Sequence, residues 1–135
     1  MKKFHWPVRV YYEDTDSGGM VYHANYLKFF ERTRTEYLRA LGYELDDVLH
    51  RMGVMFVVKS LTIEYLKPAH FNDALTATAA VTLLRPASLV FSQTLLRGDE
   101  ETLSAALIKV VCLRADGVRP VAIPEPLLQS LKHEF

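Results

Sequence analysis

Apolar and polar residues alternate along the first dozen positions, which is the pattern of a strand with one buried face. The apolar positions are Trp6, Val8, Val10 and Tyr12. Over residues 24–41 the spacing becomes helical, with a stripe made of Tyr26, Phe29, Phe30, Thr33, Tyr37, Leu38 and Leu41. Gly42 then stands where a glycine commonly ends a helix. The pattern therefore predicts a strand that leads into one long helix.

The rest of the chain is patterned as β structure. After a short helical or irregular piece at 43–52, strands are predicted over 54–66, 74–84, 88–96 and 102–114. The alternation in the second of these places Leu75, Ala77, Ala79, Val81 and Leu83 on one face. The connections are short, so the strands should pair antiparallel. A long helix followed by strands predicts an α+β fold with the helix across a twisted sheet, and a short helix is expected near Pro126.

Composition narrows the class of protein. The chain has 135 residues, half of them apolar, which suits one domain spanning 1–135. Sixteen basic and sixteen acidic side chains cancel, so no general attraction to nucleic acid or an anionic membrane is expected. Cys112 is the only cysteine, which excludes an intrachain disulfide and a cysteine-based metal cluster.

The N-terminal residues have no apolar core of a secretion signal, and no stretch approaches the ~20 apolar residues that span a bilayer. We therefore expect a soluble, cytoplasmic protein without a transmembrane segment. Four histidines, His5, His50, His70 and His133, have no ligand partners at usable spacing. No metal and no cofactor are predicted.

Residues 12–26 (YEDTDSGGMVYHANY) place three carboxylates, a glycine pair and a histidine directly before the helix. Glycine reaches positive φ without a steric penalty, so the chain can turn sharply after Asp16. The helix start would then offer its unpaired N–H groups and positive dipole end near that carboxylate. An acid or nucleophile beside such a helix end is suited to acyl transfer.

Other interpretations of this segment exist. An Asp/Gly-rich stretch also forms plain turns. An EF-hand loop beginning at Asp14 fails, because its twelfth position is Asn25 instead of a bidentate glutamate. The Asp-Ser-Gly triplet at 16–18 matches half of a dimeric aspartic protease site, but acidic residues precede it where such a site needs an apolar surround.

The string Tyr12-x-Asp14-Thr15-Asp16-x-x-Gly19-x-Val21-Tyr22-His23-Ala24-Asn25-Tyr26, followed by an aromatic helix, resembles the hotdog-fold acyl-CoA thioesterases of the 4-hydroxybenzoyl-CoA thioesterase type. Within them it is most similar to the branch associated with the Tol-Pal envelope system. The resemblance implies a hotdog fold, in which a mostly antiparallel five-stranded sheet wraps a long central helix. It also implies hydrolysis of the thioester of an acyl-CoA, or of an acyl carrier protein, to free acid and thiol.

The resemblance further implies that Asp16 is the catalytic carboxylate, acting as nucleophile or general base. The backbone N–H near His23 would polarise the thioester carbonyl. Two roles stay open for the His23 ring: it only packs or makes a neutral hydrogen bond, or it helps to position Asp16 or a water. Asp14 is expected to hold the turn through hydrogen bonds to the backbone.

Substrate contacts are expected at two places. Around the turn, Tyr12 would pack the pocket floor beside Gly19, while Tyr22 and Asn25 shape the loop. Because the protein is neutral overall, the phosphates of coenzyme A need a local basic patch. The resemblance places it before the fourth strand, at Arg85 and Ser88, with Lys59, Arg114 and Arg119 as further candidates.

The predicted sheet has two open edges, and one helix cannot cover both. We therefore expect a homodimer or a homotetramer. A different class of function also fits the fold, namely a non-catalytic module that binds acyl-CoA or an acyl carrier protein. The intact Asp16 argues against it, because a binding module has no use for a carboxylate facing a thioester.

Overall fold

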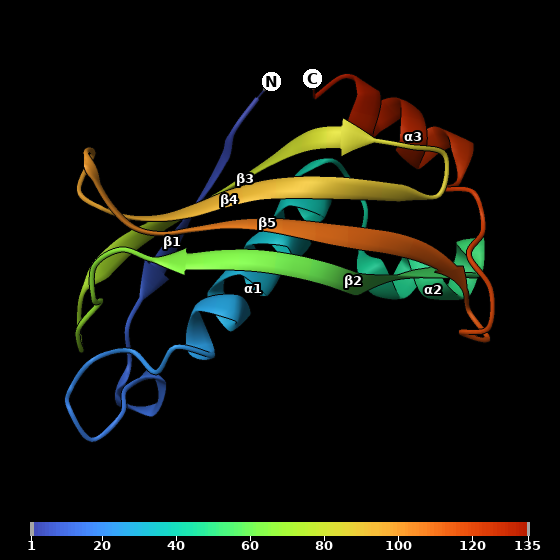
Figure 1. The fold of residues 1–135 in the computed structure, drawn as a ribbon. Helices are drawn as coiled ribbons and strands as arrows, with labels where there is room; N and C mark the ends of the chain where they lie inside the picture. Colours follow the sequence, from blue (N-terminus) through green and yellow to red (C-terminus); the bar gives the residue numbers. More distant parts are fainter. Residues whose placement is uncertain (1, 135) are drawn as a thin grey trace.

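The computed structural model of the chain describes residues 2–134 and shows an antiparallel five-stranded sheet curved around one long helix (Figure 1). The strands are β1 (Phe4–Arg9), β2 (Val54–Tyr65), β3 (Ala74–Leu84), β4 (Ser88–Arg97) and β5 (Glu101–Arg114). The helices are α1 (Asn25–Ala40), α2 (Leu45–Met52) and α3 (Glu125–Lys132), with a 3₁₀ turn η1 (Tyr12–Asp14). The sheet order is β1-β3-β4-β5-β2. The predicted α+β class and the hotdog arrangement are confirmed.

The core lies between α1 and the inner face of the sheet. The aromatic stripe of α1 is buried as predicted, with Phe29, Phe30 and Tyr37 at most 2% exposed. Among the strands, α1 packs mainly on β3, where the fully buried Ala77 and Ala79 leave room for the large helix side chains. Small residues on the strand therefore match bulky residues on the helix.

The first strand differs from the prediction. It ends at Arg9, and the chain then bends into η1 because the Asp14 carboxylate accepts a hydrogen bond from the Tyr11 N–H at 2.9 Å. Val10 is buried, but Trp6 is 37% and Tyr12 76% exposed. The prediction that Trp6 and Tyr12 lie on a buried face was therefore wrong.

A bulge explains a second difference, on β3. The pairing of β3 with β4 shifts register between Val81 and Leu83. Because one extra residue turns the following side chains to the other face, Leu83 is 43% exposed although Val81 is fully buried. Cys112 lies buried in β5 as expected, and burial raises the pKa of its thiol to about 11.

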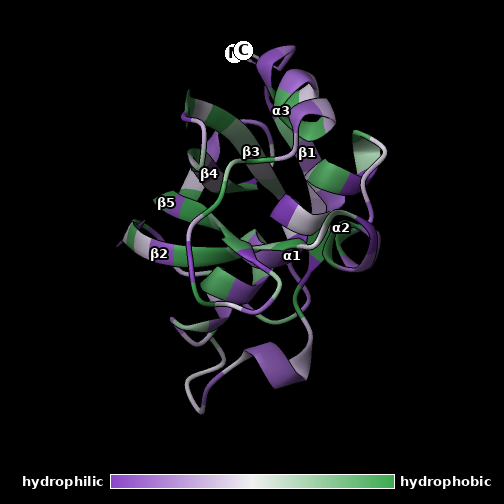
Figure 2. Cartoon of the chain, turned by 90° about the vertical axis from the view of Figure 1, so that its right-hand side faces the viewer, coloured by the Kyte–Doolittle hydropathy of each residue, from purple (hydrophilic) through white to green (hydrophobic). Residues whose placement is uncertain are grey.

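The two ends of the sheet carry different connections (Figure 1). We call one the Asp16 end; it holds residues 10–24, the loop 66–73 and the turn 98–100. The other, the Arg85 end, holds the turn 85–87 and the segment 115–120, beside α2. Figure 2 shows that the η1 turn, at the bottom of that view, is hydrophilic, whereas strands and α1 mix apolar and polar residues. None of the helices within residues 2–134 has the length and apolar character needed to cross a bilayer.

Candidate active site

A tight turn after η1 presents the Asp16 side chain. The Asp16 N–H donates to the Met20 carbonyl at 2.8 Å, and the Gly19 N–H donates to the Asp16 carbonyl at 3.0 Å. Gly19 has φ +77°, which favours glycine, and a Cβ on Gly18 would come within 3.3 Å of Asp16 Oδ1. The glycine pair thus serves both the turn and the close approach of the backbone to the carboxylate.

The Asp16 carboxylate is exposed, and only one of its two oxygens accepts a hydrogen bond. Its Oδ1 accepts the Gly18 N–H at 2.8 Å, whereas Oδ2 accepts no hydrogen bond from residues 2–134. Oδ1 is therefore fixed by a hydrogen bond, and Oδ2 is available to react with a substrate or a water. The exposure is opposite to the water-poor surround that an aspartic protease pair needs.

The start of α1 is open to an incoming anion or carbonyl oxygen. Its N-cap is Ala24, whose side chain cannot accept a hydrogen bond, and the first turn carries no acidic residue. The N–H groups of His23 and Ala24 have no acceptor within the described part of the chain. Two donors therefore stand free where the helix dipole is positive.

His23 is held by its carbonyl, to which the Tyr65 hydroxyl donates at 2.9 Å. Burial, and then the neighbouring Tyr26, raises the pKa of the Tyr65 phenol, so this donor stays protonated at neutral pH. The imidazole lies 4.5 Å from the Tyr22 ring, measured between centroids, and edge-on to Tyr65 at 6.2 Å. The ring of His23 is therefore exposed, with Tyr22 beside it and Tyr65 edge-on to it.

Asp16 and His23 face the same open depression, of about 380 Å³. The other residues that line it come from the turn, from α1 and from the segment after β2: Met20, Val21, Tyr26, Tyr65, Leu66, Lys67 and Pro68. The structure thus brings together the two residues that the sequence predicted as catalytic. Lys67 supplies a positive charge at the rim.

The loop 66–73 is bonded to the turn that carries Asp16. The Val21 N–H donates to the Ala69 carbonyl at 2.8 Å, and the Phe71 N–H donates to the Gly19 carbonyl at 3.4 Å. The Ala69 N–H donates to the Tyr26 hydroxyl at 3.0 Å, which ties the loop to α1 as well. The loop therefore forms one wall of the depression and supports the turn.

Comparisons with known proteins agree with this geometry. A family model described as "Thioesterase superfamily" matches residues 18–104, more than half of the chain. The chain belongs to the thioesterase superfamily. It is 45% identical over 130 residues to "Acyl-CoA thioesterase YbgC" of Haemophilus influenzae, covering 96% of this chain and 95% of that one. It is 43% identical over 129 residues to "Acyl-CoA thioester hydrolase YbgC" of Escherichia coli O157:H7, covering 96% of each.

The fold agrees with that of a solved relative. The "Probable Thioesterase from Bartonella henselae" superposes with a TM-score of 0.86 at 33% identity, covering 91% of this chain and 100% of that one. The matched family segment begins at Gly18 and so takes in the glycine pair, the open helix start and the loop 66–73. The depression described above therefore lies largely within the thioesterase superfamily segment.

Asp14 and Asn25 stabilise this thioesterase turn from inside. Both are buried, at 4% and 7% exposure. The Asp14 carboxylate accepts the Tyr11 N–H and the Asn25 side-chain amide, each at 2.9 Å, while the Asp14 carbonyl accepts the Tyr22 N–H, also at 2.9 Å. The structural role expected for Asp14 is confirmed. Asn25 donates its amide to Asp14, which gives it a structural role in the turn, and its predicted substrate contact stays a prediction.

Three further residues were predicted to contact the substrate: Tyr12, Gly19 and Tyr22. Tyr12 does not line the depression beside Asp16: its ring stacks on Phe71 at 3.8 Å, and the two line a separate open depression. Gly19 uses both its N–H and its carbonyl inside the protein, so it shapes the turn, and its predicted substrate contact stays a prediction. Tyr22 is 47% exposed and packs beside His23.

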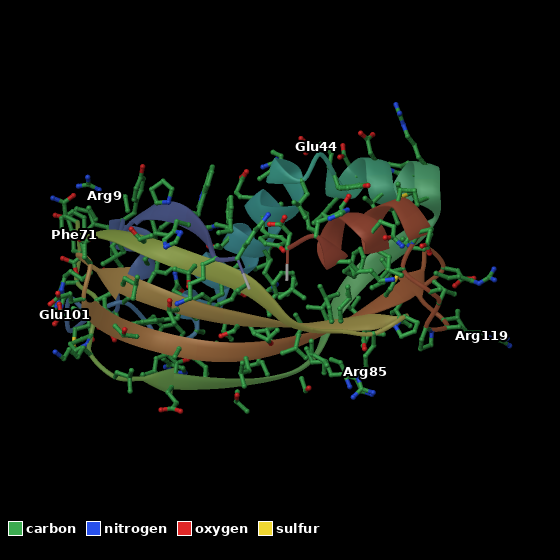
Figure 3. The ribbon with its side chains drawn as sticks, turned by 90° about the horizontal axis from the view of Figure 1, so that it is seen from above. Arg9, Glu44, Phe71, Arg85, Glu101 and Arg119 are labelled. Atoms are coloured by element: carbon green, nitrogen blue, oxygen red, sulfur yellow. The ribbon has the colours of Figure 1, made fainter. Side chains whose placement is uncertain are left out.

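Arg85 and Ser88 lie far from Asp16. They close the turn between β3 and β4, where the Arg85 N–H donates to the Ser88 carbonyl at 2.8 Å. The eleven residues of β3 separate this turn from the loop 66–73, a span of about 36 Å. Figure 3 shows Arg85 and Arg119 at one end of the molecule, with Phe71 and Glu101 at the other. Within one chain they share no site with Asp16.

Sequence reasoning missed the residues between Tyr65 and Pro68 as part of the site. No local signal marks them, since Lys67-Pro68 looks like the end of a strand. They reach Asp16 only because β2 delivers the chain to the same end of the sheet. A smaller, more enclosed cavity of about 150 Å³ lies between α1 and the sheet, beside Arg34 and Phe56, and shares no lining residue with the depression.

Proposed function

We propose that the protein is an acyl-CoA thioesterase, which hydrolyses the thioester of an acyl-CoA to a free acid and coenzyme A. The observation that carries the proposal is the Asp16 carboxylate, with one oxygen free of hydrogen bonds to residues 2–134, facing the same depression as the open start of α1. The names of the relatives that are 43–45% identical support it. An acyl carrier protein thioester would present the same reacting group to this site.

In this proposal the thioester carbonyl oxygen lies at the N–H groups of His23 and Ala24. These donors and the helix dipole stabilise the negative charge that develops on the oxygen in the transition state. Asp16 Oδ2 then acts in one of two ways. It attacks the carbonyl carbon, and water later hydrolyses the mixed anhydride, or it removes a proton from a water that attacks directly. In both routes the C–S bond breaks and the thiolate leaves, taking up a proton.

The hydrogen bonds of His23 support a backbone role for this residue. Its exposed imidazole makes no hydrogen bond to residues 2–134, whereas its carbonyl accepts the Tyr65 hydroxyl. Tyr65 fixes the peptide on the carbonyl side of His23. This bond orients the peptide between His23 and Ala24, and with it the Ala24 N–H, so His23 would contribute to catalysis through its backbone.

We also propose that the protein is at least a homodimer and that Arg85 and Ser88 act on the substrate of a second copy. The edge strand β2 exposes apolar side chains, with Val58 46% and Leu61 37% exposed. Two such edges paired antiparallel would bring the Arg85 end of one chain towards the Asp16 end of the other. A basic turn that is about 36 Å away in one chain would then be near the site of its partner.

The test is a spectrophotometric screen in which a thiol-reactive dye reports coenzyme A release from short, long and aromatic acyl-CoAs. We expect turnover of at least one of these classes. Saturable binding of acyl-CoA without any thiol release would instead indicate a non-catalytic binding module. If the protein shows no binding of any acyl-CoA and no release of coenzyme A, the proposal is wrong.

A further inference from the structure

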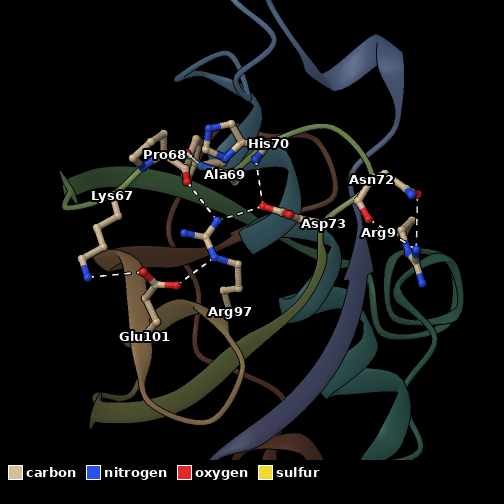
Figure 4. A network of polar contacts seen from close by, with 10 residues as sticks. Arg9, Lys67, Pro68, Ala69, His70, Asn72, Asp73, Arg97 and Glu101 are labelled. Carbon is tan, nitrogen blue, oxygen red and sulfur yellow. Dashed lines mark hydrogen bonds and ion pairs between the residues drawn. The ribbon is translucent and has the colours of Figure 1, made fainter.

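Arg97, near the C-terminal end of β4, lies at the centre of a polar network under the loop 66–73 (Figure 4). Its Nε donates to Glu101 Oε1 at 2.8 Å. Its Nη1 donates to Asp73 Oδ2 at 2.9 Å and to the Pro68 carbonyl at 3.2 Å. One guanidinium thus binds two carboxylates and a backbone carbonyl, which the fixed fork of arginine allows and lysine does not.

The network holds both ends of the loop. At its start, Lys67 Nζ donates to Glu101 Oε2 at 3.3 Å, so Glu101 joins Lys67 to Arg97. At its end, Asp73 Oδ2 also accepts the His70 N–H at 2.9 Å. Arg97 therefore fixes the loop relative to β4 at positions on either side of Ala69.

Ala69 is where the loop supports the turn that carries Asp16. It is fully buried, its carbonyl accepts the Val21 N–H at 2.8 Å, and its own N–H donates to Tyr26. Lys67 and Pro68, which the network holds directly, line the depression with Asp16 and His23. Arg97 does not line the depression and cannot touch a substrate there.

We propose that Arg97 is a positioning residue that sets the placement of Asp16 through the loop 66–73. The proposal rests on the proposed function, because it concerns the geometry of that reaction. A displacement of about 1 Å in a reacting group can cost about 10²-fold in rate. The turn around Asp16 is exposed, so this loop is the main structure that holds it from outside.

The expected effect on activity exceeds the effect on stability. The network lies near the surface, with the side chains of Arg97, Glu101 and Asp73 between 22% and 33% exposed. Ion pairs that are this exposed are screened by water and contribute little to folding. Loss of Arg97 should therefore leave the protein folded but loosen the loop and the turn.

The matched control is Arg39, which also binds two carboxylates, those of Glu36 and Glu44, near the C-terminal end of α1. We compare Arg97→Met with Arg39→Met, each of which removes the charge and keeps an unbranched side chain. Arg97→Met should lower kcat by about 10- to 100-fold with KM changed less than about 3-fold. Arg39→Met should leave both constants within about 2-fold, with a similar small change in Tm. Arg97→Lys should restore only part of kcat, because it keeps the charge without the fork.

Hydrogen exchange resolved by residue gives the readout that does not depend on turnover. In Arg97→Met the amides of Val21 and Phe71 should exchange faster, while those in β4 and β5 and all amides of Arg39→Met keep the wild-type rates. Unchanged exchange at Val21 and Phe71, or faster exchange with wild-type kcat, would overturn the proposal. If the wild-type protein hydrolyses no acyl-CoA, the proposed function fails, whereas the exchange comparison still decides whether Arg97 holds the turn.

Discussion

The Asp16 end and the Arg85 end of the sheet differ in how their loops are held. At the Asp16 end, loops from distant parts of the sequence are bonded to one another: the turn at 16–22 to the loop 66–73, and that loop to β4 through Arg97. At the Arg85 end, the turn at 85–87 is held by backbone hydrogen bonds alone: the Pro86 carbonyl accepts the Ile123 N–H at 2.8 Å, and the Ala87 carbonyl accepts the Cys112 N–H at 2.9 Å. The Arg85 side chain extends from this turn into solvent (Figure 3). The Asp16 end thus adds a side-chain network to its backbone bonds, whereas the Arg85 end presents an exposed arginine.

This difference suggests a division of labour between bond cleavage and substrate binding. Reacting groups need placement to a fraction of an ångström, so they belong where side-chain and backbone hydrogen bonds join several segments. A phosphate is bound by a positive charge that tolerates motion, so an exposed arginine on a short turn is adequate. The separation by the length of β3 means that only a second chain could join the two functions.

Replacing His23 tests the Asp16 end with a large expected effect. His23 is the second residue of a turn closed by the Asn25 N–H on the Tyr22 carbonyl at 2.8 Å, a position that proline favours. His23→Pro removes the N–H, so we expect kcat to fall by about 10²–10³-fold. His23→Ala keeps the N–H and loses the ring, so it should stay within about 5-fold of wild type.

Steady-state kinetics of both variants, with Tm as the control for folding, check this prediction. Equal large losses in His23→Pro and His23→Ala would assign the catalytic role to the imidazole instead. Wild-type kcat in a folded His23→Pro would show that this N–H does not stabilise the transition state.

Replacing Arg85 tests the other end, with a smaller expected effect. Arg85→Ala should raise KM for acyl-CoA by about 10-fold and leave kcat unchanged, because a phosphate contact remote from the thioester acts equally on ground and transition states. A truncated thioester without the nucleotide serves as the control and should be nearly insensitive. Equal losses on both substrates would show that Arg85 acts through the structure.

Mixed oligomers test whether the two ends belong to one site. If the two ends of different chains form one site, mixed Asp16→Asn and Arg85→Ala subunits should regain part of the activity at low acyl-CoA. The recovered fraction is measured after exchange of subunits, with each variant alone as the control. A monodisperse monomer in light scattering that retains full activity would contradict the shared site.

The pH dependence of stability gives the smallest expected effect. Hydrogen bonds from Arg97, and then from Lys67, hold the pKa of the Glu101 carboxyl below its usual value. Its stabilisation is therefore fully present above the ordinary glutamic acid pKa of about 4.3 and is lost as pH falls through the lower folded pKa. Glu101→Gln should lower Tm by at most a few degrees at pH 7, and the difference should close in acid.

Melting curves of wild type and Glu101→Gln from pH 7 to pH 3 provide the measurement. Glu31, which makes no ion pair within residues 2–134, is the matched position, and Glu31→Gln should show no such pH-dependent difference. A Tm difference that persists or grows in acid would rule out the ionised Glu101 as its cause.

Local patterns predicted the elements well because they depend on local physics. The stripe from Tyr26 to Leu38 and the turn with Gly19 follow from helical spacing and from the freedom of glycine. The outward position of Leu83 depends on a bulge that no residue type announces. The roles of Tyr65 and Arg97 depend on which strand ends meet in space. Sequence therefore predicted that Asp16 lies in a turn before the helix start, but not the loop that supports this turn.

The most direct test of Asp16 as the catalytic carboxylate is turnover of Asp16→Asn beside the wild-type protein on the best acyl-CoA found in the screen. The amide keeps the shape of the carboxylate and loses both its basicity and its nucleophilicity, so the fold and the assembly should persist. Oδ1 of the asparagine can still accept the Gly18 N–H that now meets Asp16 at 2.8 Å. We predict a fall in kcat of at least ~10²-fold with Tm and oligomeric state unchanged. Thioester hydrolysis at the wild-type rate by the folded variant would contradict the assignment of Asp16 as the catalytic carboxylate.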